Sequence, residues 1–455
     1  MFKIALLPFF PIYFAQVLRI RQIMRNSWAD FEPPNPNRLH KGVVFMEQKL
    51  NEYTSIEDGV VFGTHEKSFV GFPADHPMLM LCDGAAGCGK SSQFVRPIVY
   101  GSIARGETVV VSGLLCEADY LKRAAAEGYR VVVISGRNPA HGEKWDMQDM
   151  AHISQEDFCR IAEYLWARFV NRIMDWTIKG NSFLRSVFSA LLQYAIDKDG
   201  IHSLKECASY CERGAEFVDV LSRYIEENHR GGVSESSRYF DFLRISEIDS
   251  TAKEELLQSI KTILEGQQSY EMEMSGQASF RIDDLFADKG KLIVMLDICD
   301  CHETIVFDAM MYRMLQRAWE IESKTPVRFV LDDVIGFWAN LPSIESLASG
   351  IVNRGHSVYF TSQDLAQIVA CGMGNVKCQK FMYSMDAILF DDVRTDFAAS
   401  QLLMHSDFSK LLEVSSERQE DGWNVLKFHA PRNTVGADAF FVPKLSIPQY
   451  GTFAF

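Results

Sequence analysis

Apolar residues along this chain fall into two patterns, short continuous runs and longer stretches at helical spacing. Short apolar runs rich in β-branched residues are typical of strands that are buried on both faces of a sheet. They predict strands at 60–63, 78–82, 108–112, 130–134, 291–296, 327–331, 357–361 and 387–390, with edge strands between 424 and 441. Apolar residues at helical spacing predict helices at 118–127, 158–173, 182–196, 217–228 and 252–265.

The order of these elements predicts the domain organisation. Strands separated by a helix are typical of a parallel sheet that carries helices on both faces. Helical patterns then follow one another without an intervening strand, and the strands return afterwards. We therefore expect an α/β domain formed by residues 38–153 and 272–455, with an all-helical domain inserted at 154–271.

Residues 1–37 have a different character. The segment 4–18 is apolar apart from Gln16, three arginines follow by position 25, and a proline-rich linker covers 31–37. The apolar segment contains two prolines and is short for a membrane-spanning helix, which needs about 20 residues. It has no small-residue cleavage site of a signal peptide. Two interpretations stay open: a buried or interfacial helix, and a shortened membrane anchor with its arginines on the cytoplasmic side.

Composition narrows the function classes. The 455 residues, 47% of them hydrophobic and 23% charged, suit a globular protein with more than one lobe. A net charge of −14 excludes non-specific nucleic-acid binding over the whole surface, so any DNA contact has to be local. Ten scattered cysteines are typical of reduced thiols. The cluster at 299–302 and the pair Cys207 and Cys211 resemble metal ligands, but no second cluster completes either site.

The segment 84–91 reads G-A-A-G-C-G-K-S and directly follows a predicted strand, which is the context of a phosphate-binding loop. Its glycines allow several backbone N–H groups to face one anion, and the following helix adds its N-terminal dipole. In such a loop Lys90 reaches the β- and γ-phosphates of ATP, and the Ser91 hydroxyl holds Mg²⁺. The predicted nucleotide-binding residues are Gly84, Gly87, Gly89, Lys90, Ser91 and Ser92.

A pair of carboxylates ends the predicted strand at 327–331. A magnesium nucleotide site needs one acid at a strand end to hold the metal's waters, and a second acid to orient the attacking water. We assign the first role to Asp332 and the second role, in catalysis, to Asp333.

Two further candidates flank the strand at 357–361. Gln363 follows it, and a neutral amide beside the acidic strand can sense the γ-phosphate, while Ser362 can cap the next helix. Arg354 precedes the strand. It is either an arginine finger that reaches the phosphate of a neighbouring subunit in a ring or an ordinary surface residue.

The order of these motifs resembles the TraG/TraD family of type IV secretion coupling proteins, over residues 63–402. The resemblance rests on the phosphate loop with its preceding His76, on the acidic strand 327–333, and on the segment 353–364. Weaker similarity to the family's second strand, its W-N-P segment and the start of its helical domain lies at 128–134, 144–147, 181–185 and 190–194.

The resemblance implies a RecA-like nucleotide-binding domain with an inserted all-α domain, acting as a homo-hexameric ATPase. Members of the family hand DNA–relaxase complexes or effector proteins to a secretion channel at the cytoplasmic face of a bacterial inner membrane. Inner-membrane contact is expected through residues 1–25, and a cytoplasmic location if that segment does not insert. By position, the resemblance supports the assigned roles of Lys90, Ser91, Asp332, Asp333 and Gln363.

The chain departs from the family pattern in three places. Asp333 stands where the family usually has glutamate, the segment 113–117 keeps only the glutamate of D-P-K-G-E, and the two N-terminal membrane helices are reduced to one segment. These departures keep open a nucleotide-binding scaffold that recruits secretion substrates with little or no hydrolysis. Another RecA-like DNA translocase is a further alternative, although it is expected to carry a DNA-orienting domain.

Overall fold

The computed structural model describes most of the chain outside its N-terminal segment. The described residues are 50–113, 118–140, 142–151, 155–170, 182–229, 248–266, 280–287, 290–297, 305–322, 325–332, 344–369, 374–393, 396–416, 421–428 and 437–445. The predictions for residues 1–37, for Asp333 and for the cluster at 299–302 lie outside them. Among the helices that the structure describes, none is long and apolar enough to cross a membrane.

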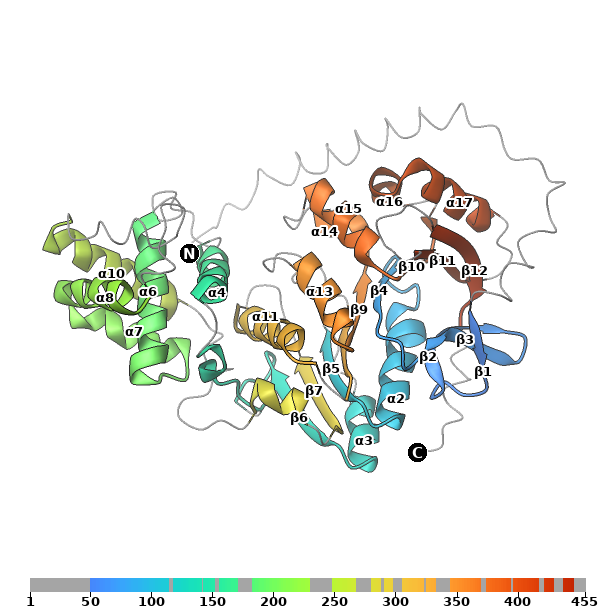
Figure 1. Ribbon diagram of the computed structural model, residues 1–455, viewed down its shortest axis with the longest axis horizontal. Coiled ribbons are helices and arrows are strands. Elements are labelled where there is room, and N and C mark those ends of the chain that lie inside the picture. The colour runs from blue at the N-terminus through green and yellow to red at the C-terminus, as the bar shows by residue number, and fades with distance from the viewer. Residues whose placement is uncertain are drawn as a thin grey trace, which may run out of the picture. The chain divides into compact units, whose positions relative to one another are not determined.

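A nine-stranded sheet in the order β12-β11-β10-β4-β9-β8-β5-β7-β6 forms the centre of the described chain (Figure 1). Its strands are β4 (Leu79–Asp83), β5 (Thr108–Gly113), β6 (Arg130–Ser135), β7 (Leu292–Asp297), β8 (Val327–Leu331), β9 (Ser357–Ser362), β10 (Ala387–Phe390), β11 (Gly422–Phe428) and β12 (Ala437–Pro443). Every pairing from β10 to β6 is parallel, and β11 and β12 close one edge in antiparallel orientation. The predicted strands of this sheet are confirmed.

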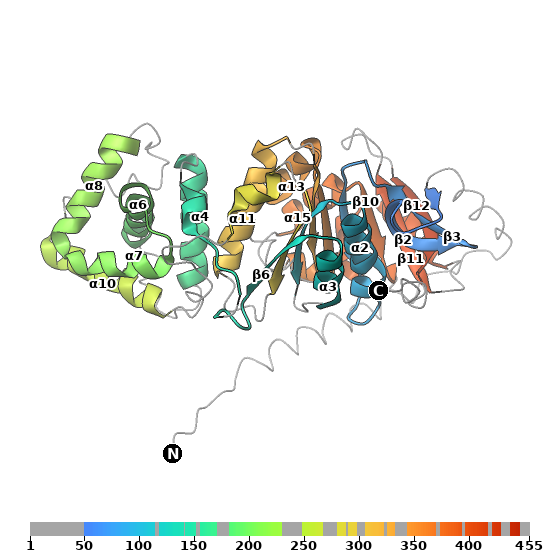
Figure 2. The ribbon, with the colours of Figure 1, turned by 90° about the horizontal axis from the view of Figure 1, so that it is seen from below.

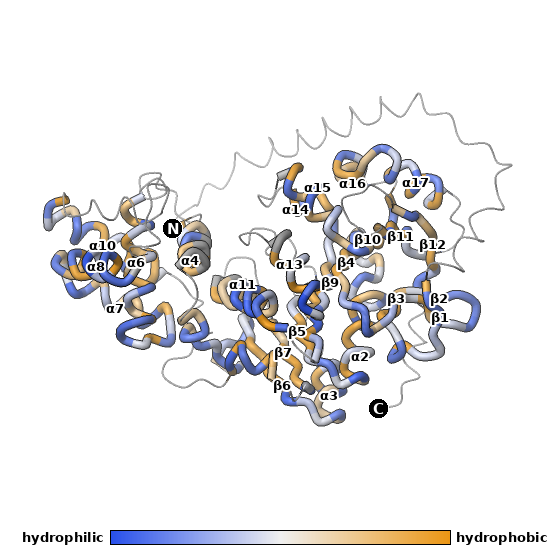
Figure 3. The backbone as a smooth tube through the Cα atoms, in the orientation of Figure 1, coloured by the Kyte–Doolittle hydropathy of each residue, from blue (hydrophilic) through white to orange (hydrophobic). Residues whose placement is uncertain are grey.

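The sheet is buried on both faces because its strands are apolar at successive positions (Figure 3). Alternate residues of β4 belong to two different hydrophobic clusters, one on each face. The first cluster includes α11 (Ile305–Glu320), α13 (Ile344–Asn353) and α15 (Gly374–Ser384). The second includes α2 (Arg96–Ala104) and α3 (Ala118–Ala126). Figures 1 and 2 show these helices beside the strands, and their two clusters confirm the predicted cover of both faces.

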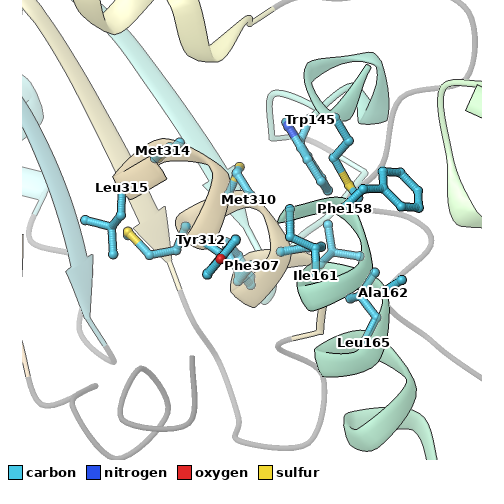
Figure 4. Close-up of a cluster of buried hydrophobic side chains, with 14 of the residues drawn as sticks. Trp145, Phe158, Ile161, Ala162, Leu165, Phe307, Met310, Tyr312, Met314 and Leu315 are labelled. Atoms are coloured by element: carbon cyan, nitrogen blue, oxygen red, sulfur yellow. The ribbon is translucent and has the colours of Figure 1, made fainter. Parts of the chain in front are cut away.

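Between β6 and β7 the described chain is helical. Its longer helices are α4 (Gln155–Val170), α6 (Ser182–Asp199), α7 (Leu204–Tyr210), α8 (Ala215–His229) and α10 (Ser250–Glu265). Figure 4 shows α4 against α11 of the sheet domain, where Phe158 and Ile161 share one buried cluster with Phe307 and Met310. The helices agree with the predicted insertion, while the exact domain boundaries stay a prediction.

Two crossing segments, 142–151 and 280–287, connect the helical insertion to the sheet. They pair through an isolated parallel bridge between Trp145 and Phe280. Near this bridge, Oδ2 of Asp149 accepts hydrogen bonds from Trp145 Nε1 (3.1 Å) and from the Ile282 amide (3.2 Å). Arg281 lies 3.9 Å from Oδ1 of the same carboxylate. Asp146 Oδ2 also lies 3.2 Å from Arg281 Nη2, so two acids of the first segment hold the second.

A separate antiparallel sheet in the order β1-β3-β2 precedes the phosphate loop. Its strands are β1 (Asn51–Tyr53), β2 (Gly59–His65) and β3 (Ser68–Pro73). A Cβ added at Gly63 would lie 2.1 Å from Val442 Cγ1, so β2 packs closely against β12 at this glycine. The sequence predicted β2 but neither β1 nor β3.

Candidate functional site

The phosphate loop and two other predicted site residues lie at the carboxyl ends of three neighbouring parallel strands. The phosphate loop follows β4, Gln363 follows β9 and Asp332 follows β8, and β9 lies between the other two strands. The amide of Gly84 donates to the carbonyl oxygen of Ser362 at 3.0 Å, so the loop begins directly beside the end of β9. Carboxyl ends of parallel strands are where open α/β sheets bind ligands.

The backbone of the loop needs its glycines. Gly87 and Gly89 have φ angles of +82° and +101°, a region that residues with a side chain rarely adopt. A Cβ on Gly84 would lie 2.6 Å from Cβ of Asp391, the residue that follows β10. The sequence G-x-x-x-x-G-K-S thus produces a tight turn that any larger residue at these positions would distort.

Lys90 is folded over the loop that precedes it. Its Nζ donates to the carbonyl oxygens of Gly84 (2.6 Å) and Ala85 (3.1 Å), and the residue is 4% exposed. Ser91 opens the helical segment Ser91–Val95, which continues into α2, and the Ser92 hydroxyl donates to the Gly89 carbonyl oxygen at 3.2 Å. A buried ammonium and a helix start therefore face the same glycine turn, which is a donor set suited to phosphate oxygens.

Asp332 is fixed in place at the end of β8. Its Oδ1 accepts a hydrogen bond from Thr361 Oγ1 on β9 at 2.8 Å, and its amide donates to the Ser112 carbonyl oxygen at 2.7 Å. The carboxylate is thus oriented at the edge of the sheet that also carries the loop. Asp333, the predicted partner, is not among the described residues.

The helix after β9 corrects one prediction. The cap of α14 (Leu365–Ile368) is Asp364, whose side chain accepts from the Ala366 amide at 2.7 Å. The Ser362 hydroxyl instead accepts from the Asp364 amide at 3.3 Å. The proposed cap at Ser362 is wrong because Ser362 still belongs to β9, and Gln363 lies between the strand and the capped helix.

Arg354 lies at the amino ends of the parallel strands, opposite the phosphate loop. It follows α13 and precedes β9, a strand of six residues that spans about 20 Å. Its Nε donates to the carbonyl oxygen of Trp319 in the same chain at 3.1 Å. The structure therefore does not bring Arg354 to the phosphate loop of its own chain, and a role at a neighbour's site stays a prediction.

Three residues beside the loop were missed by the sequence analysis. Asp83, which ends β4, is buried, and burial together with the acidic neighbour Asp396 raises the pKa of Asp83 well above its usual value. Asp396 also caps α16 (Phe397–Leu402) through the Ala399 amide at 2.9 Å. Burial and a neighbouring acid both favour the protonated form of a carboxyl group. The third residue is Lys444, which follows β12 and donates to the Cys88 carbonyl oxygen of the phosphate loop at 2.7 Å.

The pair Cys207 and Cys211 lies buried in the helical insertion as free thiols. Burial raises the pKa of Cys211 to about 12. Among the residues that the structure describes, no group of three or more His, Cys, Asp or Glu side chains is placed to hold a metal ion.

Solved structures share this fold at low sequence identity. The plasmid coupling protein TrwB in complex with the ATP analogue ADPNP matches with a TM-score of 0.55 and 14% identity, over 92% of this chain and 96% of TrwB. TrwB with ADP and Mg²⁺ matches with a TM-score of 0.53 and 15% identity, over 91% and 93%. VirB4 of Thermoanaerobacter pseudethanolicus matches with a TM-score of 0.52 and 12% identity, over 87% and 98%.

These matches establish the fold class, a RecA-like phosphate-loop domain combined with an all-α domain, as predicted. No family model matches the chain, and no curated protein matches its sequence significantly.

Proposed function

We propose that this chain is an ATP-hydrolysing coupling protein that delivers DNA–relaxase complexes or protein substrates to a type IV secretion channel. The observation that carries the proposal is the convergence of the phosphate loop, Gln363 and Asp332 at one edge of a RecA-like sheet. The likeness to TrwB, which has been solved with ADPNP and with ADP and Mg²⁺, supports ATP and Mg²⁺ as ligands here.

The donor set of the loop fits a triphosphate. Lys90 offers a buried ammonium, and its present acceptors, the carbonyl oxygens of Gly84 and Ala85, are weaker partners than phosphate oxygens. Ser91 and Asp332 are the proposed ligands of Mg²⁺ or of its waters, with Asp332 held in orientation by Thr361. Bound Mg²⁺ supplies positive charge against the phosphates.

The remaining steps of the proposal concern hydrolysis and assembly. Asp333 is proposed to orient the attacking water, and Gln363 to respond to the γ-phosphate. In a homo-hexameric ring, Arg354 of one subunit is proposed to complete the site of its neighbour. Contact with a bacterial inner membrane is proposed for residues 1–25, which would keep the ATPase domain at the cytoplasmic face.

One observation favours a second candidate, a nucleotide-binding scaffold that recruits substrates with little hydrolysis. The side chain of Asp333 is one methylene shorter than the glutamate usual in the resembling family, so it holds a water less closely to the phosphate. The scaffold and the motor bind the same nucleotide and differ only in turnover.

The test measures ATP binding and steady-state hydrolysis, with and without single-stranded DNA. We compare the wild type with Lys90→Ala and Asp333→Asn, and use Lys261→Ala as a control, because Lys261 pairs with Glu212 in the helical insertion. The motor proposal expects DNA-stimulated turnover that both site variants abolish, with binding retained in Asp333→Asn. Binding without turnover in the wild type supports the scaffold, and a wild type that binds no ATP refutes both.

A further inference from the structure

We infer that Lys444, the residue directly after the edge strand β12, positions the phosphate loop by holding the carbonyl oxygen of Cys88. The inference deepens the proposed function, because it assigns a new residue to the same nucleotide site. Lys444 is 356 positions from Cys88 in the sequence, and nothing in its local sequence marks it as part of a phosphate site.

The ammonium of Lys444 is fully engaged. Its Nζ lies 2.7 Å from the Cys88 carbonyl oxygen, 2.6 Å from Asp391 Oδ1 and 3.0 Å from Asp421 Oδ1. A lysine has three N–H donors, so these three acceptors use all of them. The side chain is 4% exposed, and the Trp423 ring centroid lies 4.5 Å from Nζ. The charged group is therefore fixed in position rather than mobile in solvent.

Lys444 keeps its charge in this buried place. Burial acts to lower the pKa of Lys444, but the hydrogen bonds that Lys444 donates to Asp391 and Asp421 outweigh it and raise the pKa. The two acids come from the end of β10 and the start of β11, so three elements at the closed edge of the sheet fix the ammonium. Because these acids neutralise it, Lys444 acts on the loop through geometry rather than by attracting phosphate.

Holding the Cys88 carbonyl orients the next amide. A trans peptide is planar, and its C=O and N–H bonds point in opposite directions. The carbonyl that faces Lys444 therefore turns the amide of Gly89 away from Lys444. Gly89 itself has a φ of +101°, which glycine adopts freely, so its own backbone does little to restrict how the Cys88–Gly89 peptide turns. The bond from Lys444 supplies that restriction at the peptide that leads into Lys90.

Lys90 has to change its hydrogen-bond acceptors when a nucleotide binds, whereas Lys444 does not. Lys90 holds the carbonyl oxygens of Gly84 and Ala85 and has to release them when it turns to a phosphate. Lys444 holds Cys88 from the outer side of the loop and can keep that bond throughout. Lys444 therefore maintains the loop conformation while Lys90 changes partners.

The test uses hydrogen exchange of the amides of residues 84–92 in the nucleotide-free protein, together with ATP affinity and kcat. We compare the wild type with Lys444→Met, and with Lys444→Met/Asp391→Asn, which also removes the charge of one acid that binds Lys444. Lys253→Met is the matched control, because Lys253 is a similarly buried lysine that pairs with Asp219 at 2.6 Å in the helical insertion.

Loss of a hydrogen bond from a charged donor predicts exchange about tenfold faster and ATP affinity about tenfold weaker in both Lys444 variants. We expect kcat at saturating ATP within about twofold of the wild type, because bound nucleotide restores the loop. The control leaves all three quantities unchanged. Wild-type exchange rates at 84–92 in the double variant refute the inference. If the wild type binds no ATP, the proposed function fails, and the exchange measurement alone still decides the role of Lys444.

Discussion

Replacing Asp149 by asparagine is expected to stabilise the protein at alkaline pH and much less at acidic pH. Burial at the junction of the crossing segments raises the pKa of Asp149 from 3.8 to about 7. The hydrogen bonds from Trp145 Nε1 and the Ile282 amide both reach the same oxygen, Oδ2. An asparagine amide oxygen can accept both, so the variant keeps these bonds and removes only the ionisation.

The magnitude follows from the two pKa values. The unfolded chain releases the proton of Asp149 near pH 3.8 and the folded chain near pH 7, so this group costs stability progressively as the pH rises between them. Each unit in that window costs about 1.4 kcal/mol, and above the folded pKa the cost is constant. Between about pH 5 and about pH 8 the wild type therefore loses about 2.5 kcal/mol that the Asp149→Asn variant retains.

Urea unfolding of both proteins at about pH 5 and about pH 8 measures this difference. Subtracting the wild type from the variant at each pH removes the contributions of ionisable groups that the two proteins share. Asp283→Asn is the control, because that carboxylate is 70% exposed on the other crossing segment, 280–287, and we expect no pH-dependent gain. An equal effect of Asp149→Asn at both pH values would show that Asp149 is ionised in the folded protein and refute the reasoning.

Two further substitutions test the sheet and the loop. Glu107→Gln removes the negative charge that binds Arg328 Nη2 at 2.7 Å, and Arg328 is 1% exposed, so we expect a loss of about 3–5 kcal/mol in urea unfolding. A loss below about 1 kcal/mol contradicts this account of the ion pair. Gly89→Ala is expected to weaken binding of a fluorescent ATP analogue at least about tenfold, since the residue has a φ of +101°. Gly128→Ala is its control, with a φ of +78° and open space for a Cβ, and should leave binding unchanged.

The sheet could be predicted largely because its strands are buried on both faces and read as continuous apolar runs. A helix that is buried on several sides lacks the polar face that identifies a surface helix in a sequence. The sequence analysis did not predict α11, whose apolar residues enter the core on more than one side, as Phe307, Met311 and Tyr312 illustrate. The strands β1 and β3 were also missed, because exposed and half-buried positions replace the continuous apolar run that marks the strands of the large sheet.

Within the site, the residues found from the sequence are those that carry a local pattern. The phosphate loop has a fixed spacing, and Asp332 and Gln363 follow apolar strands directly. Lys444 and Asp396 have no such pattern, because their partners Cys88 and Asp83 come from distant parts of the chain. Side chains that hold the site residues in position reach them only through the tertiary fold, so the structure is needed to identify them.

The pairing of the sheet has a consequence for synthesis of the protein on the ribosome. Three strands of the nine-stranded sheet, β4, β5 and β6, are made before the helical insertion and pair only with strands made after it, as far as the described residues show. Met78 donates to the Ser357 hydroxyl across 279 positions, which a ribosome covers in roughly 15–60 seconds at about 5–20 residues per second. During that interval the complete phosphate loop exists without the strands that hold it. A nascent chain that stops within the insertion therefore contains the nucleotide-binding sequence with its apolar strand edges unpaired, a species prone to aggregation.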